Sequence, residues 1–257
     1  MNVTHDSDRT AAVGEVRVRS PRLLLIPAFN EEARISEVLR QVAEMGLGFQ
    51  VVVVDDGSRD RTALLARQYG ARVLQHSFNL GYGAALQTGY KYALGCGAEL
   101  VVQMDADGQH DPRDISKLIE PVQDGTADLV IGSRFLGGAR YRMSLAKNLG
   151  RSFLSAVARG FDLSITDPTS GFQAMNREVL GLYVQDFFPC DFPDLDVLLA
   201  ARRSGIRIAE RPVSMAPSPR PSSIHRRLRS TYYVYKMVLS IWAGTTGYDG
   251  GRASLRP

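Results

Sequence analysis

The sequence predicts an α/β fold in which a mostly parallel central sheet is flanked by helices. Short apolar, β-branched runs alternate with stretches of helical periodicity through the first half of the chain. One run consists of consecutive valines, Val51 to Val54, which is typical of a strand buried on both faces of a parallel sheet. Polar and acidic residues follow these runs, and repeated strand–helix units build parallel sheets with helices on both faces.

The expected elements follow in order along this first half. Residues 23–26 form an apolar strand that ends at Pro27, and 32–45 form a helix because Ile35, Val38 and Leu39 recur at helical spacing. The further expectations are a strand at 51–54, a helix at 60–69, a strand at 72–75, a helix at 83–94, a strand at 100–104, a helix at 111–122 and a strand at 128–132.

The regular alternation ends at about Leu136. Beyond it the pattern predicts helices at 143–161, 192–204 and 226–243, a short strand at 206–209 and a loop at 167–171. The stretch at 212–221 is rich in Pro and Ser and is expected to be irregular.

Length and composition suit one such domain. The 257 residues and a hydrophobic fraction of 44% can fill a sizeable core. Residues 1–20 are polar and lack the apolar segment of a secretory signal, so we expect a loose extension, then a main domain at 21–215 and a basic, aromatic tail at 216–257. The net charge of +4 fits a phosphate-bearing ligand or an anionic surface.

Cysteine usage and hydropathy narrow the class of protein. Cys96 and Cys190 have neither metal-ligand spacing nor a disulfide framework, which predicts two reduced thiols. No run reaches the roughly 18 apolar residues that a membrane span needs. We therefore expect a cytoplasmic protein with at most a peripheral contact to the inner face of the cell membrane. No nucleic-acid partner is expected, and a homodimer is left open.

Ligands of open α/β sheets bind beyond the carboxyl ends of the strands. The residues that follow the expected strands are polar, acidic and turn-forming, as such a binding edge requires. They are Pro27 to Glu31, Asp55 to Ser58, Asp105 to Asp107, and Ser133 with Arg134.

The central feature is the segment Asp105-Ala106-Asp107 at the end of an apolar strand. Carboxylates at positions i and i+2 of an extended chain point to one side, so both can face one hard cation. Mg²⁺ or Mn²⁺ prefers such oxygen ligands and often shares its shell with substrate phosphates. The alternative is a pair of solvated loop aspartates, and the position at the ligand edge favours the metal site.

Two neighbouring loops offer contacts to a nucleoside. One carboxylate of Asp55 and Asp56 would accept hydrogen bonds from a nucleobase, while Ser58 or Asp60 caps the next helix. Phe29 offers a stacking surface and Glu31 an acceptor for ribose hydroxyls; the alternative for this turn is helix entry with Asn30 as the cap.

A glycine turn, Asn79 to Gly83, opens the helix expected at 83–94. It lacks the third glycine of a dinucleotide-binding fingerprint, because Leu86 stands there, and it does not follow the first strand. Helix packing is therefore its first expected role, and donor contacts are the second.

Taken together, the motifs resemble family 2 glycosyltransferases of the GT-A fold, in particular the branch of dolichyl-phosphate mannose synthase and bacterial polyprenyl-phosphate transferases. The resemblance covers about Arg22 to Ala243, which makes 21–215 the catalytic domain. It rests on the ordered segments IPAFNEE, VVVVDDGSRDRT, NLGYGAALQTGY, MDADGQHDP, IGSRF and DPTSGFQAMN.

The resemblance implies a set of site residues. Pro27, Phe29 and Glu31 would hold the nucleoside and Asp56 would read the base. Asp105 and Asp107, with Ala106 between them and Gln109 as a further contact, would hold Mg²⁺ or Mn²⁺. The phosphate and acceptor side would be formed by Arg134, Asp167, Ser170 and Gly171.

Two later segments are also read through the resemblance. Arg220 resembles an arginine that closes over the phosphates, although Pro221 departs from the family's glycine-bearing pattern and Arg226 or Arg227 is an alternative. Asp194 precedes a helix where relatives with hydroxyl acceptors place a general base; the alternative for Asp194 is a carboxylate favoured by the helix dipole. The basic and aromatic helix at 226–243 predicts either an interfacial membrane contact or packing on the domain or a second copy.

The sequence therefore predicts a metal-dependent, inverting glycosyltransferase. The donor is a UDP- or GDP-linked sugar, and the acceptor is a polyprenyl phosphate, a saccharide or a small molecule. Two alternatives stand beside it. A sugar-phosphate nucleotidyltransferase would show a Gly-rich basic loop after the first strand, where this chain has PAFNEE, and an inactive nucleotide-binding protein would not need the intact Asp105 and Asp107.

Overall fold

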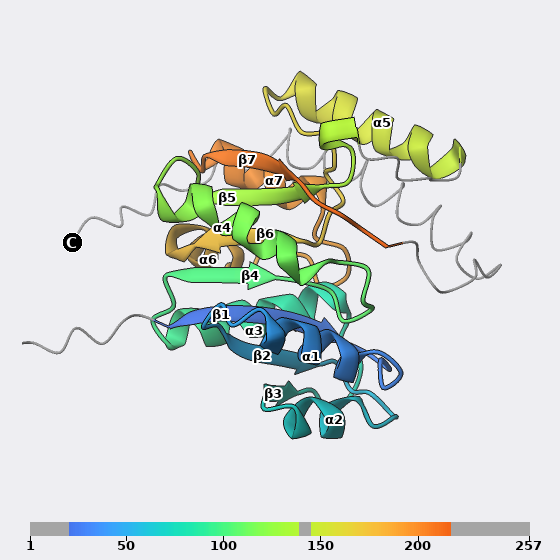
Figure 1. The fold of residues 1–257 in the computed structure, drawn as a ribbon. Helices are drawn as coiled ribbons and strands as arrows, with labels where there is room; N and C mark the ends of the chain where they lie inside the picture. The colour runs from blue at the N-terminus through green and yellow to red at the C-terminus, as the bar shows by residue number, and fades with distance from the viewer. Residues whose placement is uncertain (1–20, 139–144, 217–257) are drawn as a thin grey trace, which may run out of the picture.

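A computed structural model describes residues 21–138 and 145–216 of the chain (Figure 1). The expected N-terminal extension, the helix at 226–243 and Arg220 lie outside these residues. No helix among those described is long and apolar enough to cross a membrane.

The centre of the fold is a seven-stranded sheet with the order β3-β2-β1-β4-β6-β5-β7. Within it β6 runs antiparallel to β4 and β5, and the other pairings are parallel. The mostly parallel sheet is thus confirmed. Its strands are β1 (Arg22–Ala28), β2 (Gln50–Asp55), β3 (Arg72–Gln75), β4 (Leu100–Gln103), β5 (Leu129–Ser133), β6 (Gln173–Asn176) and β7 (Ile208–Pro212).

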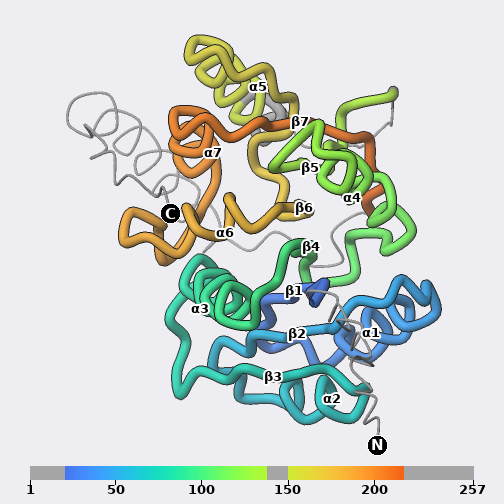
Figure 2. Tube along the Cα trace, turned by 90° about the vertical axis from the view of Figure 1, so that its left-hand side faces the viewer, coloured from blue at the N-terminus to red at the C-terminus, as the bar shows by residue number. Residues whose placement is uncertain are grey.

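Helices cover both faces of this sheet (Figures 1 and 2). One layer holds α1, α2 and α4, the other holds α3, α6 and α7, and α5 lies outside α7. Their bounds are α1 (Ile35–Glu44), α2 (Thr62–Gln68), α3 (Tyr82–Gly95), α4 (Ile115–Gln123), α5 (Leu145–Gly160), α6 (Arg177–Tyr183) and α7 (Leu195–Arg203), with 3-10 turns at Pro112–Asp114 and Leu136–Gly138.

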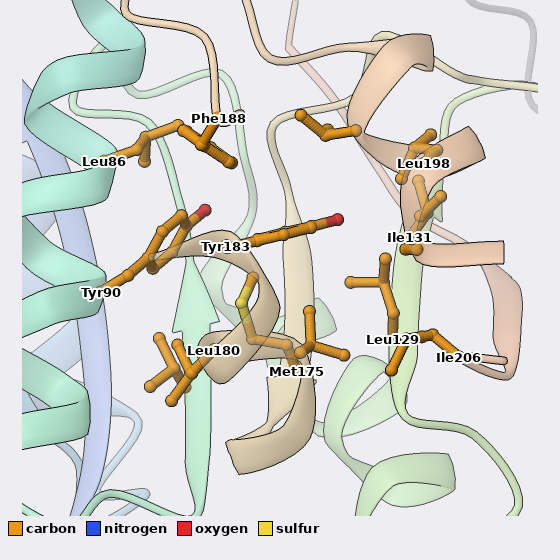
Figure 3. Close-up of a cluster of buried hydrophobic side chains, with 14 of the residues drawn as sticks. Leu86, Tyr90, Leu129, Ile131, Met175, Leu180, Tyr183, Phe188, Leu198 and Ile206 are labelled. Carbon is orange, nitrogen blue, oxygen red and sulfur yellow. The ribbon is translucent and has the colours of Figure 1, made fainter. Parts of the chain in front are cut away.

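Each strand of the parallel half contributes side chains to two hydrophobic cores. In β1, Leu23 and Leu25 face the core under α3, whereas Leu24 and Ile26 face the core under α1. This two-residue alternation with apolar side chains on both faces explains why the strands read as continuous apolar runs. Figure 3 shows the first core, where Tyr90 of α3 and Tyr183 of α6 pack against each other with ring centroids 5.7 Å apart.

The first strand extends further than expected, through Pro27 to Ala28. Its pairing with β4 reaches only as far as Leu25, whereas its pairing with β2 continues to Ala28. Met104 N still donates to Leu25 O at 3.0 Å, and Pro27, which has no N–H, ends the pairing on the β4 side.

Two elements, β6 and α6, were not expected from the sequence. The helix α6 has a local signal, because the side-chain oxygen of Asn176 accepts hydrogen bonds from Glu178 N at 3.0 Å and Val179 N at 3.1 Å. An asparagine N-cap of this kind could have been found. The strand β6 has only four residues and pairs with strands distant in the sequence.

The alternative for this turn, with Asn30 as the helix cap, is wrong. Helix α1 begins at Ile35, and Asn30 adopts a left-handed conformation with φ of 54°. Its side-chain oxygen instead accepts a hydrogen bond from Arg59 N at 2.9 Å. A tertiary contact thus takes the side chain away from the helix that follows it.

The expected packing role of the glycine turn fits the contacts at the start of α3. Cys190 O accepts a hydrogen bond from Ala84 N at 2.8 Å, and Asp191 O accepts one from Gly83 N at 3.2 Å. A Cβ atom at Gly81 would lie 2.7 Å from Cys190 O, and one at Gly83 would overlap Pro189 O. The glycines therefore let a distant loop occupy the helix N-terminus, which a phosphate would otherwise use.

We expect Gly83→Ala to lower the free energy of unfolding by about 1–3 kcal/mol, because the new methyl group must displace the backbone at Pro189. Urea denaturation followed by circular dichroism measures the change. Gly95→Ala is the matched control in the same helix, since nothing lies within 4 Å of its Cβ position. Equal stability of the two variants would contradict the packing role.

Candidate functional site

The loops after β1 and β2 are bound together at the carboxyl edge of the sheet. Asn30 N donates to Ser58 Oγ at 2.9 Å, and Glu31 N donates to Thr62 Oγ1 at 2.8 Å. Ser58 thus holds the neighbouring loop, while the Asp60 carboxylate accepts from Thr62 N at the start of α2. These bonds give the edge a defined shape before any ligand arrives.

A cavity of about 680 Å³ opens beside these loops. Phe29 and Phe78 both line it, and their residues are 41% and 66% exposed. Exposed aromatic faces at a cavity suit a flat, aromatic ligand. The full lining is Phe29, Asn30, Gly57, Ser58, Arg59, Gln75, His76, Ser77, Phe78 and Asn79.

Phe29 was predicted at this edge from the sequence, whereas the segment from His76 to Phe78 was not. Those residues directly follow β3, so the strand-end rule applied to the third strand would have found them. Gly57 lets the segment approach, because a Cβ atom there would lie 2.7 Å from the Phe78 Cα.

Asp56 is buried beside this cavity. It contacts His76, which lines the cavity, and the backbone of the segment that follows. Its Oδ1 accepts from Leu80 N at 2.9 Å and lies 2.8 Å from His76 Nδ1, and its Oδ2 accepts from Gly81 N at 2.9 Å. A carboxylate offers about four acceptor sites, so Oδ2 retains capacity for a base N–H. Reading a base stays a prediction for this residue, and the structure adds a bracing role.

Glu31 is also largely buried, at 7% exposure, and forms a 3.2 Å ion pair with Arg34. Pro27 stands inside β1. Their expected roles in nucleoside binding stay predictions.

The aspartates Asp105 and Asp107 follow β4 and keep part of their surface exposed, whereas Ala106 between them is buried in the core. Asp105 Oδ1 accepts a hydrogen bond from Tyr82 Oη at 2.8 Å. Asp107 Oδ1 accepts from Gln109 N at 3.0 Å, which closes the loop on itself. The burial of Ala106 thus anchors the loop, while both carboxylates stay partly exposed.

The buried His110 supports this loop, and this residue was not predicted from the sequence. Its Nδ1 accepts from Asp105 N at 3.1 Å, and its ring stacks on Phe172 with centroids 4.8 Å apart. Burial lowers the pKa of His110, against the opposing charge of Asp105, so the ring is neutral with its proton on Nε2. The charged groups whose fields reach this ring are Asp105, Asp107, Arg134 and Asp167.

Arg134 and Asp167 form a bidentate ion pair. Nε donates to Oδ2 at 2.6 Å and Nη2 donates to Oδ1 at 2.6 Å, with the Asp167 side chain fully buried. Both residues were predicted in the site from the sequence, but their ion pair was not. The pair fixes the guanidinium at the sheet edge, close to the aspartate loop.

Glu210 of β7 braces this pair and was not foreseen. Its Oε1 accepts from Thr166 N and Asp167 N, both at 2.9 Å. Burial raises the pKa of the Glu210 carboxyl, and these backbone donors partly offset that shift. A carboxylate on the last described strand thereby shapes the loop that carries Asp167.

Asp194 and Gln109 are two further predicted site residues, and the structure shows their surroundings. Asp194 stands at the N-cap of α7 without a side-chain cap bond, so a base role stays a prediction. Gln109 O accepts from Ala216 N at 2.8 Å, and Met215 Sδ lies 3.8 Å from Arg134 Nη1. The chain that leads toward Arg220 therefore leaves the described fold beside the aspartate loop.

The aspartate loop fits a hard divalent cation by its donor chemistry. Asp105 and Asp107 supply carboxylate oxygens, and Gln109 supplies an amide oxygen on the same loop. Among the residues described, no group of three or more His, Cys, Asp and Glu side chains forms a metal site. A cation bound here would complete its shell with water or ligand oxygens, as Mg²⁺ usually does.

The seven-stranded, mostly parallel sheet with acidic loops at its carboxyl edge matches solved structures of the GT-A type glycosyltransferase fold. Residues 24–182 match the family described as Glycosyl transferase family 2. The chain therefore belongs to family 2 of the glycosyltransferases and is an enzyme of that class.

Named relatives act on lipid phosphates. The UDP-N-acetylglucosamine–dolichyl-phosphate N-acetylglucosaminyltransferase of Methanococcus voltae is 30% identical over 212 residues, which cover 74% of this chain and 83% of the relative. The polyprenol monophosphomannose synthase of Mycolicibacterium smegmatis is 34% identical over 191 residues, covering 67% and 69%.

A solved structure with the same fold is the glucosyl-3-phosphoglycerate synthase of Mycobacterium tuberculosis in complex with Mn²⁺, UDP-glucose and phosphoglyceric acid. It matches with a TM-score of 0.60 and 25% identity, over 79% of this chain and 73% of that chain.

We expect Asp167→Ala to lower the free energy of unfolding by about 3–5 kcal/mol, because it leaves the largely buried Arg134 guanidinium without its partner. Urea denaturation at neutral pH measures the loss. Arg113→Ala is the control, since it removes a 2.6 Å ion pair to Asp111 from a side chain that is 77% exposed. A loss no larger than that of the control would show that the Arg134 pair does not support the fold.

Proposed function

We propose that this protein transfers a sugar from a nucleoside-diphosphate sugar to a phosphate-bearing acceptor, with inversion at the anomeric carbon. The observation that carries the proposal is the partly exposed pair Asp105 and Asp107 on the loop after β4. This loop shares the sheet edge with a cavity of about 680 Å³ and an arginine held in an ion pair. Such an edge combines contacts to a nucleoside, a cation and phosphates, which are the parts of this donor.

The nucleoside would bind in the cavity between Phe29 and the segment that holds Phe78. Its base would stack on one of these rings and reach the Asp56 carboxylate, with Pro27 and Glu31 beside the ribose. The donor is UDP- or GDP-linked. Two names support a UDP donor, that of the Methanococcus voltae relative and that of the mycobacterial complex with UDP-glucose.

A divalent cation, Mg²⁺ or Mn²⁺, would be held by Asp105 and Asp107, with Gln109 as a further ligand. When bound, it supplies Lewis-acid stabilisation of the charge that develops on the leaving diphosphate. The Mn²⁺ of the mycobacterial complex supports this choice of metal.

The chain's own residues would orient the reacting groups. Asp167 holds Arg134 through Nε and Nη2, so the guanidinium meets a phosphate in one orientation. Electrostatic stabilisation by such preorganised groups is usually the largest catalytic contribution. The acceptor oxygen attacks the anomeric carbon from the face opposite the diphosphate, whose bond to that carbon breaks as the new bond forms.

The acceptor side would be formed by the loop from Asp167 to Gly171. A polyprenyl phosphate is the favoured acceptor, because the named relatives act on dolichyl or polyprenol phosphates. A phosphate oxygen is already ionised and needs no strong base, so Asp194 would act as a base only with a saccharide or small-molecule hydroxyl.

A thermal-shift screen of UDP- and GDP-sugars with Mn²⁺, followed by transfer to polyprenyl phosphate, tests the proposal. A true donor at 100 times its dissociation constant stabilises the fold by about 2.7 kcal/mol, or about 5–10 °C in a protein of this size. Stabilisation without transfer to any acceptor would instead indicate an inactive nucleotide-binding protein.

We expect Asp107→Ala to abolish transfer, because it removes one of two carboxylates from the cation site. Transfer of a radiolabelled sugar at saturating Mn²⁺ measures the loss. Asp186→Ala is the control, since Asp186 is exposed and stands outside the site loops. Near-wild-type turnover of Asp107→Ala with metal still required would refute the assignment of this carboxylate.

A further inference from the structure

A chain of hydrogen bonds runs from the core beneath α3 to the aspartate loop. Tyr90 Oη donates a short hydrogen bond to Gln103 Oε1, Gln103 Nε2 donates to Tyr82 Oη at 3.1 Å, and Tyr82 Oη donates to Asp105 Oδ1 at 2.8 Å. Tyr90 and Gln103 are buried, at 1% and 3% exposure. A buried polar group normally needs a hydrogen-bond partner, and these side chains serve as partners for one another.

The direction of every bond in this chain is determined. Gln103 Oε1 has no proton, so Tyr90 must donate to it, and the amide nitrogen then faces Tyr82. The oxygen of Tyr82 is occupied as an acceptor, so its single proton points to Asp105.

The opposite side of the same contact is closed by Gly171. A Cβ atom at this position would lie 2.8 Å from Tyr82 Oη and 3.1 Å from Asp105 Oδ2. The loop that carries Asp167 therefore packs its backbone against the hydroxyl and the carboxylate together. The Asp105 side chain is therefore held by one donor and lies against the Gly171 backbone.

We propose that Tyr82 is a positioning residue that orients the Asp105 carboxylate for the cation, and that Gln103 and Tyr90 orient Tyr82. This inference rests on the proposed function, because it takes Asp105 as a metal ligand. Removing a group that orients a metal ligand in this way typically lowers metal affinity 10- to 100-fold. Tyr82 itself needs no contact with donor or acceptor.

The test is the Mn²⁺ affinity of the full chain, measured from the EPR signal of free Mn²⁺ with and without UDP or GDP. We expect Tyr82→Phe to weaken Mn²⁺ binding about 10-fold or more. The Mn²⁺ concentration for half-maximal transfer should rise in parallel, with a smaller change in the rate at saturating Mn²⁺.

Tyr183→Phe is the matched control. Tyr183 is buried in the neighbouring cluster (Figure 3), and its hydroxyl has no hydrogen-bond partner in the part of the chain that the structure describes. Loss of that hydroxyl should leave Mn²⁺ affinity unchanged. An equal loss in both variants would mean that removing any buried hydroxyl disturbs the site, and would overturn the proposal.

Asp107→Ala separates this inference from the proposed function. If Asp107→Ala weakens Mn²⁺ binding and Tyr82→Phe does not, the metal site stands and the positioning role is wrong. If neither variant weakens it, the metal assignment itself fails. Should Tyr82→Phe unfold, Tyr90→Phe tests the same chain, because it removes only the hydroxyl that orients Gln103. Wild-type Mn²⁺ affinity in that variant would then overturn the proposal.

Discussion

The backbone pairing of β1 with β2 and with β4 is the constraint on which the candidate site depends. These three strands are parallel and end at one edge, so Phe29, Asp56 and Asp105 reach the same side of the sheet from distant parts of the sequence. Hydrogen bonds between the loops, such as Asn30 N to Ser58 Oγ, then fix their shape. Strand direction therefore brings the loops of the site together, and individual side chains then fix the shape of these loops.

Two buried carboxylates at this edge are compensated within the protein. Asp167 is paired with Arg134, and Asp56 accepts backbone N–H groups, so both are satisfied by named donors. A buried charge without such partners would destabilise the fold by several kcal/mol. The same contacts hold these groups still, which is what preorganised electrostatic stabilisation requires. Stability and the proposed chemistry thus use the same interactions.

The two halves of the site differ in how they are built. The nucleoside side rests on consecutive strand–helix units, whose loops are local in sequence. The phosphate and acceptor side is assembled from β5, the loop at Asp167 and β7, with Glu210 bracing a loop that lies 43 residues earlier. The match to family 2 of the glycosyltransferases covers residues 24–182, which include β5 and the loop at Asp167, whereas β7 lies beyond it.

The alternation of apolar runs and helical stretches was enough to predict the α/β class, most element positions and the edge that carries Asp105 and Asp107. These features follow from local periodicity, which one sequence displays directly. Other features were not predicted. Asn30, considered as an alternative helix cap, instead accepts a hydrogen bond from Arg59 N, and β6 lies antiparallel between β4 and β5. Tyr82, His110 and Glu210 support the site through hydrogen bonds that the sequence did not indicate. Only the tertiary structure decided these outcomes, because each depends on which distant residue supplies a hydrogen-bond partner or fills a space, and no local pattern encodes that choice.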